Sequence, residues 1–221
     1  MFKKRLLAWI SCGLCILSLS SGLVMGQQRG GGGRGPQTRA RYELATLAEV
    51  QSELKLNDDQ KKLAKDLLAK QREKRQSFTQ GGDFQAMRAE MAKMNAEFDT
   101  EFMAKLDEKQ NARMHGLIAQ VNGATALIDP AIAKALGVTE EQMKKLKATN
   151  DANLAARREA MAGLQDMTPE QRQEAMAKLT EQESKLLLAD VGDELKKKLE
   201  DLKGTALTID QAPLRPARPG N

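Results

Sequence analysis

Apolar residues recur every three or four positions through most of the chain between residues 40 and 210. The most regular run is a stripe of aromatic and methionine side chains: Phe84, Met87, Met91, Met94 and Phe98. Steps of three and four place such residues along one helix face, as in a coiled-coil seam. The next position of the seam after Phe98 is occupied by Glu101, so Phe102 lies beside the seam. The pattern predicts an all-α fold of elongated helical hairpins or a bundle, since each helix has one apolar stripe to cover.

Six helix starts carry residues suited to capping. An Ncap side chain accepts a hydrogen bond from a free N–H of the first turn, and a Gln three residues later can bond back. The predicted Ncaps are Asn57, Asp83, Asp107, Thr139, Thr168 and Gly192. Four starts share an apolar residue, a cap and a Gln, and these residues form the helix-cap motif: Leu56, Asn57, Gln60, Leu106, Asp107, Gln110, Val138, Thr139, Gln142, Met167, Thr168 and Gln171.

The spacing of these caps indicates an internal duplication. The first three Ncaps are 26 and 24 residues apart, and the second three are 29 and 24 residues apart. Each set is followed by a similar segment that begins with glycine, GATALID at residues 123–129 and GTALTID at residues 204–210. We therefore predict two tandem three-helix units, residues 40–128 and 129–210. The alternative is a coincidence of caps on helices rich in Glu and Lys.

Two shorter helices and two terminal segments complete the predicted organisation. One short helix spans about residues 41–53, and a second begins at Asp129-Pro130 and ends at Gly137. Residues 27–39 form a linker rich in Gly and Arg, which we expect to be flexible because poly-Gly loses much backbone entropy on ordering. Residues 211–221 form a Pro-rich tail.

Residues 1–26 have the pattern of a secretory signal peptide. Lys3, Lys4 and Arg5 form a basic start, residues 6–24 are apolar apart from Ser and Gly, and small residues follow. Cleavage after Gly26 or after Ser20 fits the pattern. We therefore expect a periplasmic or otherwise extracytoplasmic protein. The alternative is an uncleaved membrane anchor, because residues 6–24 approach the ~20 residues that span a bilayer.

Composition and charge narrow the function classes. The chain has 221 residues, with 35 Lys and Arg against 30 Asp and Glu, and the predicted signal peptide holds three of the basic residues and no acidic one. The exported chain is then close to neutral, which argues against nucleic acid as a partner. Both cysteines, Cys12 and Cys15, leave with the signal peptide, so packing alone must hold the exported fold. Alternating Val, Ile, Thr and Tyr are nearly absent, which argues against a β fold.

The sequence offers no catalytic, cofactor-binding or metal-ligating set. His115 is the only histidine, and residues 30–35 lack the Lys-Ser/Thr of a phosphate-binding loop. Acidic pairs such as Asp58 and Asp59 lie at predicted helix starts, where the helix dipole accounts for them. We therefore expect a protein that is not an enzyme and has no cofactor. A metal-responsive sensor built on His115 and Met114 is an alternative, because methionine sulfur suits Cu(I).

The helix-cap motif resembles the LTxxQ motif of the Spy/CpxP family of extracytoplasmic stress proteins. The longest local match is Leu56–Leu63, and the likeness covers about residues 50–204 as two family units in tandem. No copy reads strictly Leu-Thr-x-x-Gln: other capping residues replace the Thr in the first unit, and Val138 and Met167 replace the Leu. The resemblance implies an antiparallel helical cradle, usually a homodimer, whose concave face shields unfolded clients without ATP.

The resemblance and the apolar stripe together predict an ATP-independent chaperone-like protein (a holdase) that binds unfolded or envelope proteins. Methionine adapts to varied apolar partners, which suits promiscuous recognition. The candidate client-binding residues are Phe84, Met87, Met91, Met94, Phe98 and Phe102. In the competing interpretation, the same stripe is simply core. A structural helical assembly protein of the envelope is the alternative function, and membrane contact is expected only through an uncleaved signal segment.

Overall fold

The computed structural model describes residues 39–78, 84–164 and 167–214, and these residues form helices and connecting turns without a strand. The all-α prediction is therefore confirmed. The predicted signal peptide, nearly all of the Gly/Arg-rich linker and the end of the Pro-rich tail lie outside the described residues, as does the predicted Ncap Asp83. No helix within the described ranges is long and apolar enough to cross a membrane.

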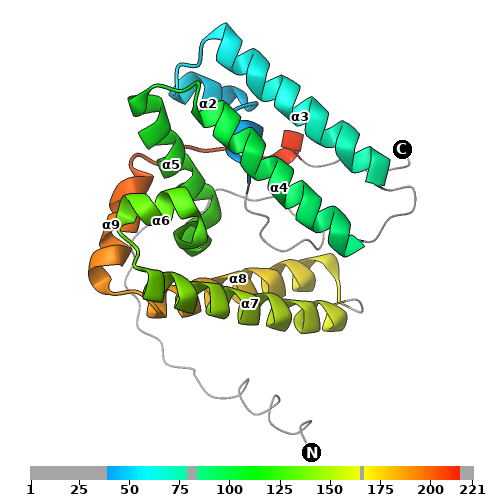
Figure 1. The fold of residues 1–221 in the computed structure, drawn as a ribbon. Coiled ribbons are helices and arrows are strands. Elements are labelled where there is room, and N and C mark those ends of the chain that lie inside the picture. Colours follow the sequence, from blue (N-terminus) through cyan, green and yellow to red (C-terminus); the bar gives the residue numbers. More distant parts are fainter. Residues whose placement is uncertain (1–38, 79–83, 165–166, 215–221) are drawn as a thin grey trace, which may run out of the picture.

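The helices form two long hairpins joined by shorter elements (Figure 1). The first hairpin pairs α3 (Asp58–Phe78) with α4 (Phe84–Met103), and the second pairs α7 (Glu140–Gly163) with α8 (Pro169–Ala189). The other elements are α1 (Arg41–Leu44), α2 (Ala48–Glu53), α5 (Glu108–Asn122), η2 (Gly123–Ile128), α6 (Pro130–Leu136), α9 (Asp193–Lys203) and η3 (Ala212–Leu214). Both hairpins point toward the same side of the molecule, opposite α5, α6 and α9.

The capping chemistry places the helix starts as the sequence predicts. Asp107, Thr139 and Thr168 each accept a hydrogen bond from the backbone N–H of the glutamine three residues later, which bonds back to the cap. Asn57 and Gln60 make the same pair of bonds at 2.9 Å each. Gly192 is the Ncap of α9, where no side chain is available to accept a bond. These local bonds satisfy N–H groups that the first helical turn leaves free.

The predicted short helix at residues 41–53 is wrong in one respect, because the structure divides it into α1 and α2. The hydroxyl of Thr46 donates to the carbonyl of Glu43 at 2.7 Å, and the Thr46 N–H bonds to the same oxygen. Leu47 is then extended and serves as the Ncap of α2. A threonine side chain that bonds its own backbone offers the chain an alternative to continuing the helix.

The core lies where α1, α5 and η2 meet the bases of the hairpins. Helix α1 packs against α3 and α4, whereas η2 packs against α7 and α8, and α5 packs along α9. Helices α5 and α9 approach so closely at Gly116 that a Cβ there would lie 2.5 Å from the carbonyl oxygen of Leu202. This contact accounts for a glycine in the middle of a helix, which otherwise costs stability relative to alanine.

Candidate functional site

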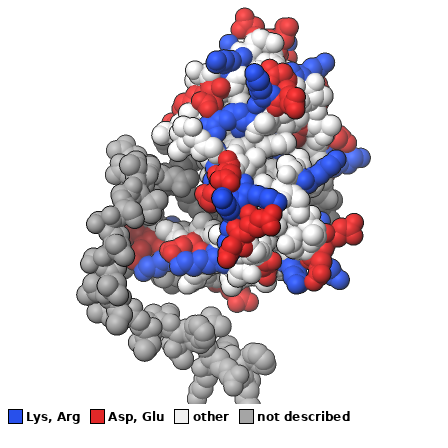
Figure 2. All heavy atoms as spheres, turned by 90° about the vertical axis from the view of Figure 1, so that its left-hand side faces the viewer, with Lys and Arg blue, Asp and Glu red and all other residues white. Residues whose placement is uncertain are grey.

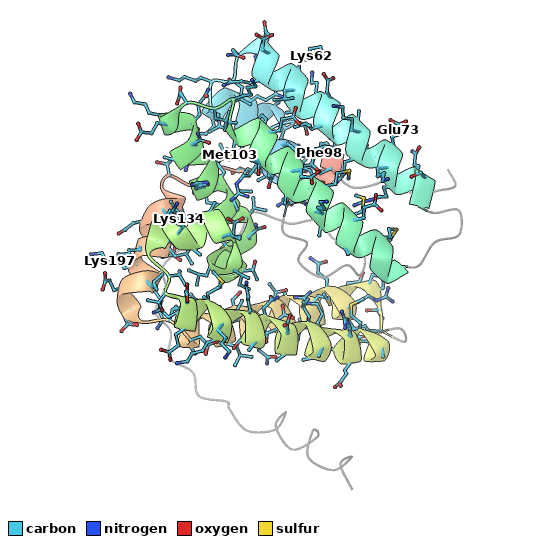
Figure 3. All side chains as sticks on the ribbon, viewed as in Figure 1. Lys62, Glu73, Phe98, Met103, Lys134 and Lys197 are labelled. Carbon is cyan, nitrogen blue, oxygen red and sulfur yellow. The ribbon has the colours of Figure 1, made fainter. Side chains whose placement is uncertain are left out.

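The predicted client-binding stripe divides into a buried end and a half-buried end along α4. Phe102 has none of its surface exposed, so its prediction as a client-binding residue is corrected: it belongs to the core between α4 and the base of the molecule. Phe98 is half-buried and packs against the core (Figure 3). Met94, Met91 and Met87 are also half-buried, and they lie outside the core cluster. The side chain of Phe84 lies outside the described part of the chain.

Tyr42 of α1 covers the core end of the stripe. Its ring meets the Phe98 ring edge-on, with centroids 5.6 Å apart. Its hydroxyl donates to Oδ1 of Asn95 at 2.7 Å, and Gln71 of α3 donates to Oε1 of Glu43 at 2.6 Å. Burial raises the pKa of Tyr42, so the phenol stays a hydrogen-bond donor. α1 therefore packs against α3 and α4 at the core end of the stripe. The other end, formed by Met87, Met91 and Met94, lies outside the core cluster, and we call it the open end.

A charged cluster centred on Arg41 joins the first hairpin to the start of α6. The Arg41 guanidinium donates to Asp99 Oδ2 of α4 at 3.1 Å and to Asp129 Oδ1 at 2.7 Å. Asp99 Oδ1 also accepts the backbone N–H groups of Arg41 and Tyr42, at 2.6 and 3.3 Å. Asp129 is the Ncap of α6 and accepts the N–H groups at the start of that helix. One guanidinium therefore fixes α1, α4 and α6 relative to one another.

The two carboxylates of this cluster respond differently to the same guanidinium. Burial raises the pKa of Asp99 and outweighs the opposing charge of Arg41. Burial also acts on Asp129, but there the hydrogen bond and charge of Arg41, together with the N–H groups of α6, hold the pKa below its usual value. The cluster therefore stabilises the charged form of Asp129, whereas the charged form of Asp99 is on balance disfavoured.

His115 of α5 lies near this cluster and is half-buried. Burial lowers its pKa, and the positive charge of Arg41 lowers it further against the weaker attraction of Asp129. The same positive charge disfavours a metal cation at His115, and no group of three or more His, Cys, Asp or Glu in the described ranges is arranged to hold a metal ion. Met114, the other residue of the metal-sensor alternative, is fully buried, and that alternative stays a prediction.

The lowered pKa of His115 predicts that stability falls as pH decreases below about 6.5. The unfolded chain takes up the proton first, so the free energy of unfolding decreases until the pH reaches the lower pKa of the folded state. We expect the thermal midpoint to drop between about pH 7.5 and pH 5.5, and to drop less in His115→Gln. An equal drop in both proteins would exclude His115, the only histidine of the chain, as the titrating group.

The second hairpin carries a buried ion pair where the first carries aromatic side chains. Arg157 of α7 is paired with Glu183 of α8 and also donates to Thr180 at 3.1 Å. Asn153 donates to the Glu183 carbonyl at 3.2 Å. Among the described side chains, the large apolar residues that remain exposed are Leu186 and Met167, at 54% and 37% exposure, on or beside α8. Polar contacts thus join α7 to α8 in the second hairpin, in addition to the buried Leu146 and Leu187.

The helix-cap residues of the first half do more than cap. Gln60 donates to the Lys105 carbonyl at 2.7 Å and to Gln110 Oε1 at 2.9 Å, and Gln110 donates to the Leu54 carbonyl at 3.0 Å. The two glutamines thus connect the starts of α3 and α5. The sequence predicted that each glutamine bonds within its own helix, and it did not predict the contact between them. The one hint of this contact was that both occupy the same position of the helix-cap motif.

The surface shows no area of a single charge sign on the face in Figure 2, where Lys and Arg alternate with Asp and Glu. The described part of the protein has shallow hollows on its surface. One is lined by Ala48, Gln51, Ser52, Lys55, Leu56 and Lys61, and another by Lys93, Ala96, Glu97, Thr100 and Glu101. Neither brings together the residue types of a catalytic set.

Comparison with known proteins gave no relatives: no family model, curated protein or solved structure matches the chain. The arrangement of side chains is therefore the basis for the functional conclusion.

Proposed function

We propose that this protein is an exported, ATP-independent holdase that contacts unfolded or envelope clients through the open end of the α4 stripe. One observation carries the proposal: Met87, Met91 and Met94 are half-buried yet lie outside the core. They lie on α4 of the first hairpin without belonging to the contiguous cluster that holds the fold together. Flexible thioether side chains at such a site can adapt to varied apolar segments.

The surroundings of these methionines suit recognition of unfolded chains. Lys74 and Glu90 form a 2.8 Å ion pair that bridges α3 and α4, and both side chains remain about half exposed. Lys93 and Glu97 lie on the same helix and are mostly exposed. Charges of both signs around an apolar strip favour encounter with polypeptides of mixed charge and keep the strip soluble.

The proposal includes two tandem helical units that together form a cradle like that of the Spy/CpxP family. Two short elements, α1 and η2, each pack against the hairpin that follows them. Each half also has a residue at positive φ just before its first long helix, Lys55 at 50° and Gly137 at 76°, 82 residues apart. Asn57 and Thr139, the next caps, have the same separation. These correspondences support two tandem units that provide within one chain what a family homodimer provides with two.

Suppression of client aggregation tests the proposal. We expect stoichiometric protein to reduce the light scattering of an unfolding client without nucleotide. The triple variant Met87→Gln, Met91→Gln, Met94→Gln should lose most of this effect, because it makes the open end of the stripe polar. Met167→Gln is the matched control, since Met167 is an exposed methionine outside the stripe.

Scattering unchanged by the wild-type protein would refute the holdase proposal. Equal suppression by the triple variant would refute the assignment to α4. A pull-down dominated by one stoichiometric partner, with no effect on scattering, would instead favour the structural assembly protein.

A further inference from the structure

The chain after α9 forms a strap across the core, which we define as residues 205–214; it is extended up to Gln211 and ends in η3. It leaves the end of α9, runs past α5 and ends at η3 beside the first hairpin (Figure 1). Gln211 accepts a 3.2 Å hydrogen bond from Arg39, which precedes α1. The strap thus connects the far end of the second half to the start of the first.

The strap lies on the core like an extended peptide ligand. Leu207, Ile209 and Gln211 are half-buried, whereas the residues between them, Thr208 and Asp210, are exposed. Leu207 and Ile209 pack against the core cluster, and Leu214 is part of it. Side chains at every second position therefore face the protein, which is the pattern of an extended segment on an apolar surface.

Side chains of α5 hold the start of the strap. Gln120 donates to the Thr205 carbonyl at 2.7 Å and accepts the Leu207 N–H at 3.1 Å. Arg113 donates to the Thr205 carbonyl at 2.7 Å. Within the described residues, the backbone–backbone hydrogen bond of the strap is the one that closes its end, from Leu214 N–H to the Gln211 carbonyl. A segment attached in this way can leave without breaking a helix or a ladder.

The strap also contrasts with the first copy of its own sequence. Residues 123–128 form the 3₁₀ helix η2, with Ala124, Ala126 and Leu127 buried. Residues 204–209 have a related sequence, which shares the first Gly and the last Ile but differs at the four positions between them. They are extended, and Leu207 and Ile209 are only half-buried. The two related segments thus adopt two different conformations. The second copy is the less firmly packed one.

We propose that the strap is a removable internal occupant of a peptide site on α5 and the adjoining core, and that the site binds an extended client segment with apolar residues at alternate positions. The proposal rests on the holdase function and adds a second contact to the α4 stripe. Gln120 binds the backbone of the occupant at both an N–H and a carbonyl, independently of sequence, while the apolar positions select the client. With the strap in place, the apparent affinity for a client is reduced by the fraction of molecules in which the site is open.

Peptide binding tests the inference directly. A labelled peptide of residues 205–214 is titrated, with fluorescence anisotropy as the readout, into the intact protein and into a chain that ends at Gly204. We expect the shortened chain to bind at least ~10-fold more tightly than the intact protein, because its site is always open. The same peptide with Leu207→Asp and Ile209→Asp should not bind. Equal affinity of both proteins, or no binding to a shortened chain that retains its helical circular dichroism, would overturn the inference.

A second variant keeps the inference testable if the shortened chain fails to fold. Gln120→Ala in the full chain removes the side chain that holds both Thr205 and Leu207. Hydrogen exchange of residues 206–211 should become faster while α5 and α9 stay protected, and peptide binding should increase. Gln173→Ala on α8, an exposed glutamine, is the matched control. Unchanged exchange and binding in Gln120→Ala would contradict the proposed site.

The two proposals fail in different ways. Peptide binding to the opened site without any suppression of client aggregation would support the strap site and refute the holdase. Suppression that is equal in intact and opened proteins, without peptide binding, would support the holdase and refute the strap site.

Discussion

Replacing Arg41 by alanine is expected to lower the free energy of unfolding by about 3–5 kcal/mol. The change removes the partner of two largely buried carboxylates, Asp99 and Asp129, whose side chains are 16% and 13% exposed. A buried charge without its partner costs far more than an exposed ion pair gains, because neither water nor an opposite charge replaces the lost interaction. Asp129 would also lose the cation that lowers its pKa.

Urea denaturation measures this loss, and the matched control is Lys62→Ala. Lys62 pairs with Asp66 at 2.6 Å on the outer side of α3, but its side chain is 76% exposed. An exposed pair of this kind contributes little to stability, because water screens the two charges. A similar, small effect of both substitutions would show that Arg41 does not hold the core together. Retention of stability in Arg41→Lys would show that charge alone, without the two-pronged guanidinium, is sufficient.

The second large effect is expected for Phe102→Ala, at about 3–5 kcal/mol. Phe102 is fully buried in the core, so truncation removes its transfer free energy and leaves a cavity that the surrounding helices cannot fill completely. Since none of its surface is exposed, the folded fraction of the variant should suppress client aggregation as well as the wild type does.

Met91→Ala provides the contrast on the same helix. Met91 is half-buried and outside the core, so its substitution should change the unfolding midpoint much less than Phe102→Ala but should weaken suppression of aggregation. Thermal denaturation and light scattering of the two variants separate a core residue from a client-contact residue. Loss of suppression in Phe102→Ala at temperatures where it is folded would contradict this division of the stripe.

The sequence by itself determined the helix starts, because capping is local. Asn57, Asp107, Thr139 and Thr168 cap helices through residues three positions away, and such bonds form within a single turn. The helical class followed from apolar residues at helical spacing. The helix endings at Gly123, Gly137 and Gly204 were also predictable, because each glycine adopts a positive φ that other residues disfavour.

The burial of the apolar stripe could not be predicted from its local sequence. Its period predicted correctly that the residues share a helix face, but a period does not state what covers that face. The structure covers Phe98 with Tyr42, a residue 56 positions earlier in the chain, and leaves the methionines beyond it outside the core. Burial depends on which other elements reach the helix, so the core and the candidate binding surface separated only in three dimensions.

Only the tertiary structure decided the contacts between distant segments. Arg41 meets Asp129 across 88 residues, Gln60 meets Gln110 across 50, and Arg39 meets Gln211 across 172. Each partner is a common polar residue whose local sequence carries no sign of the other. Local sequence fixes where helices begin and end, whereas neighbours fix which polar and apolar groups are paired, because pairing depends on where the whole chain places them.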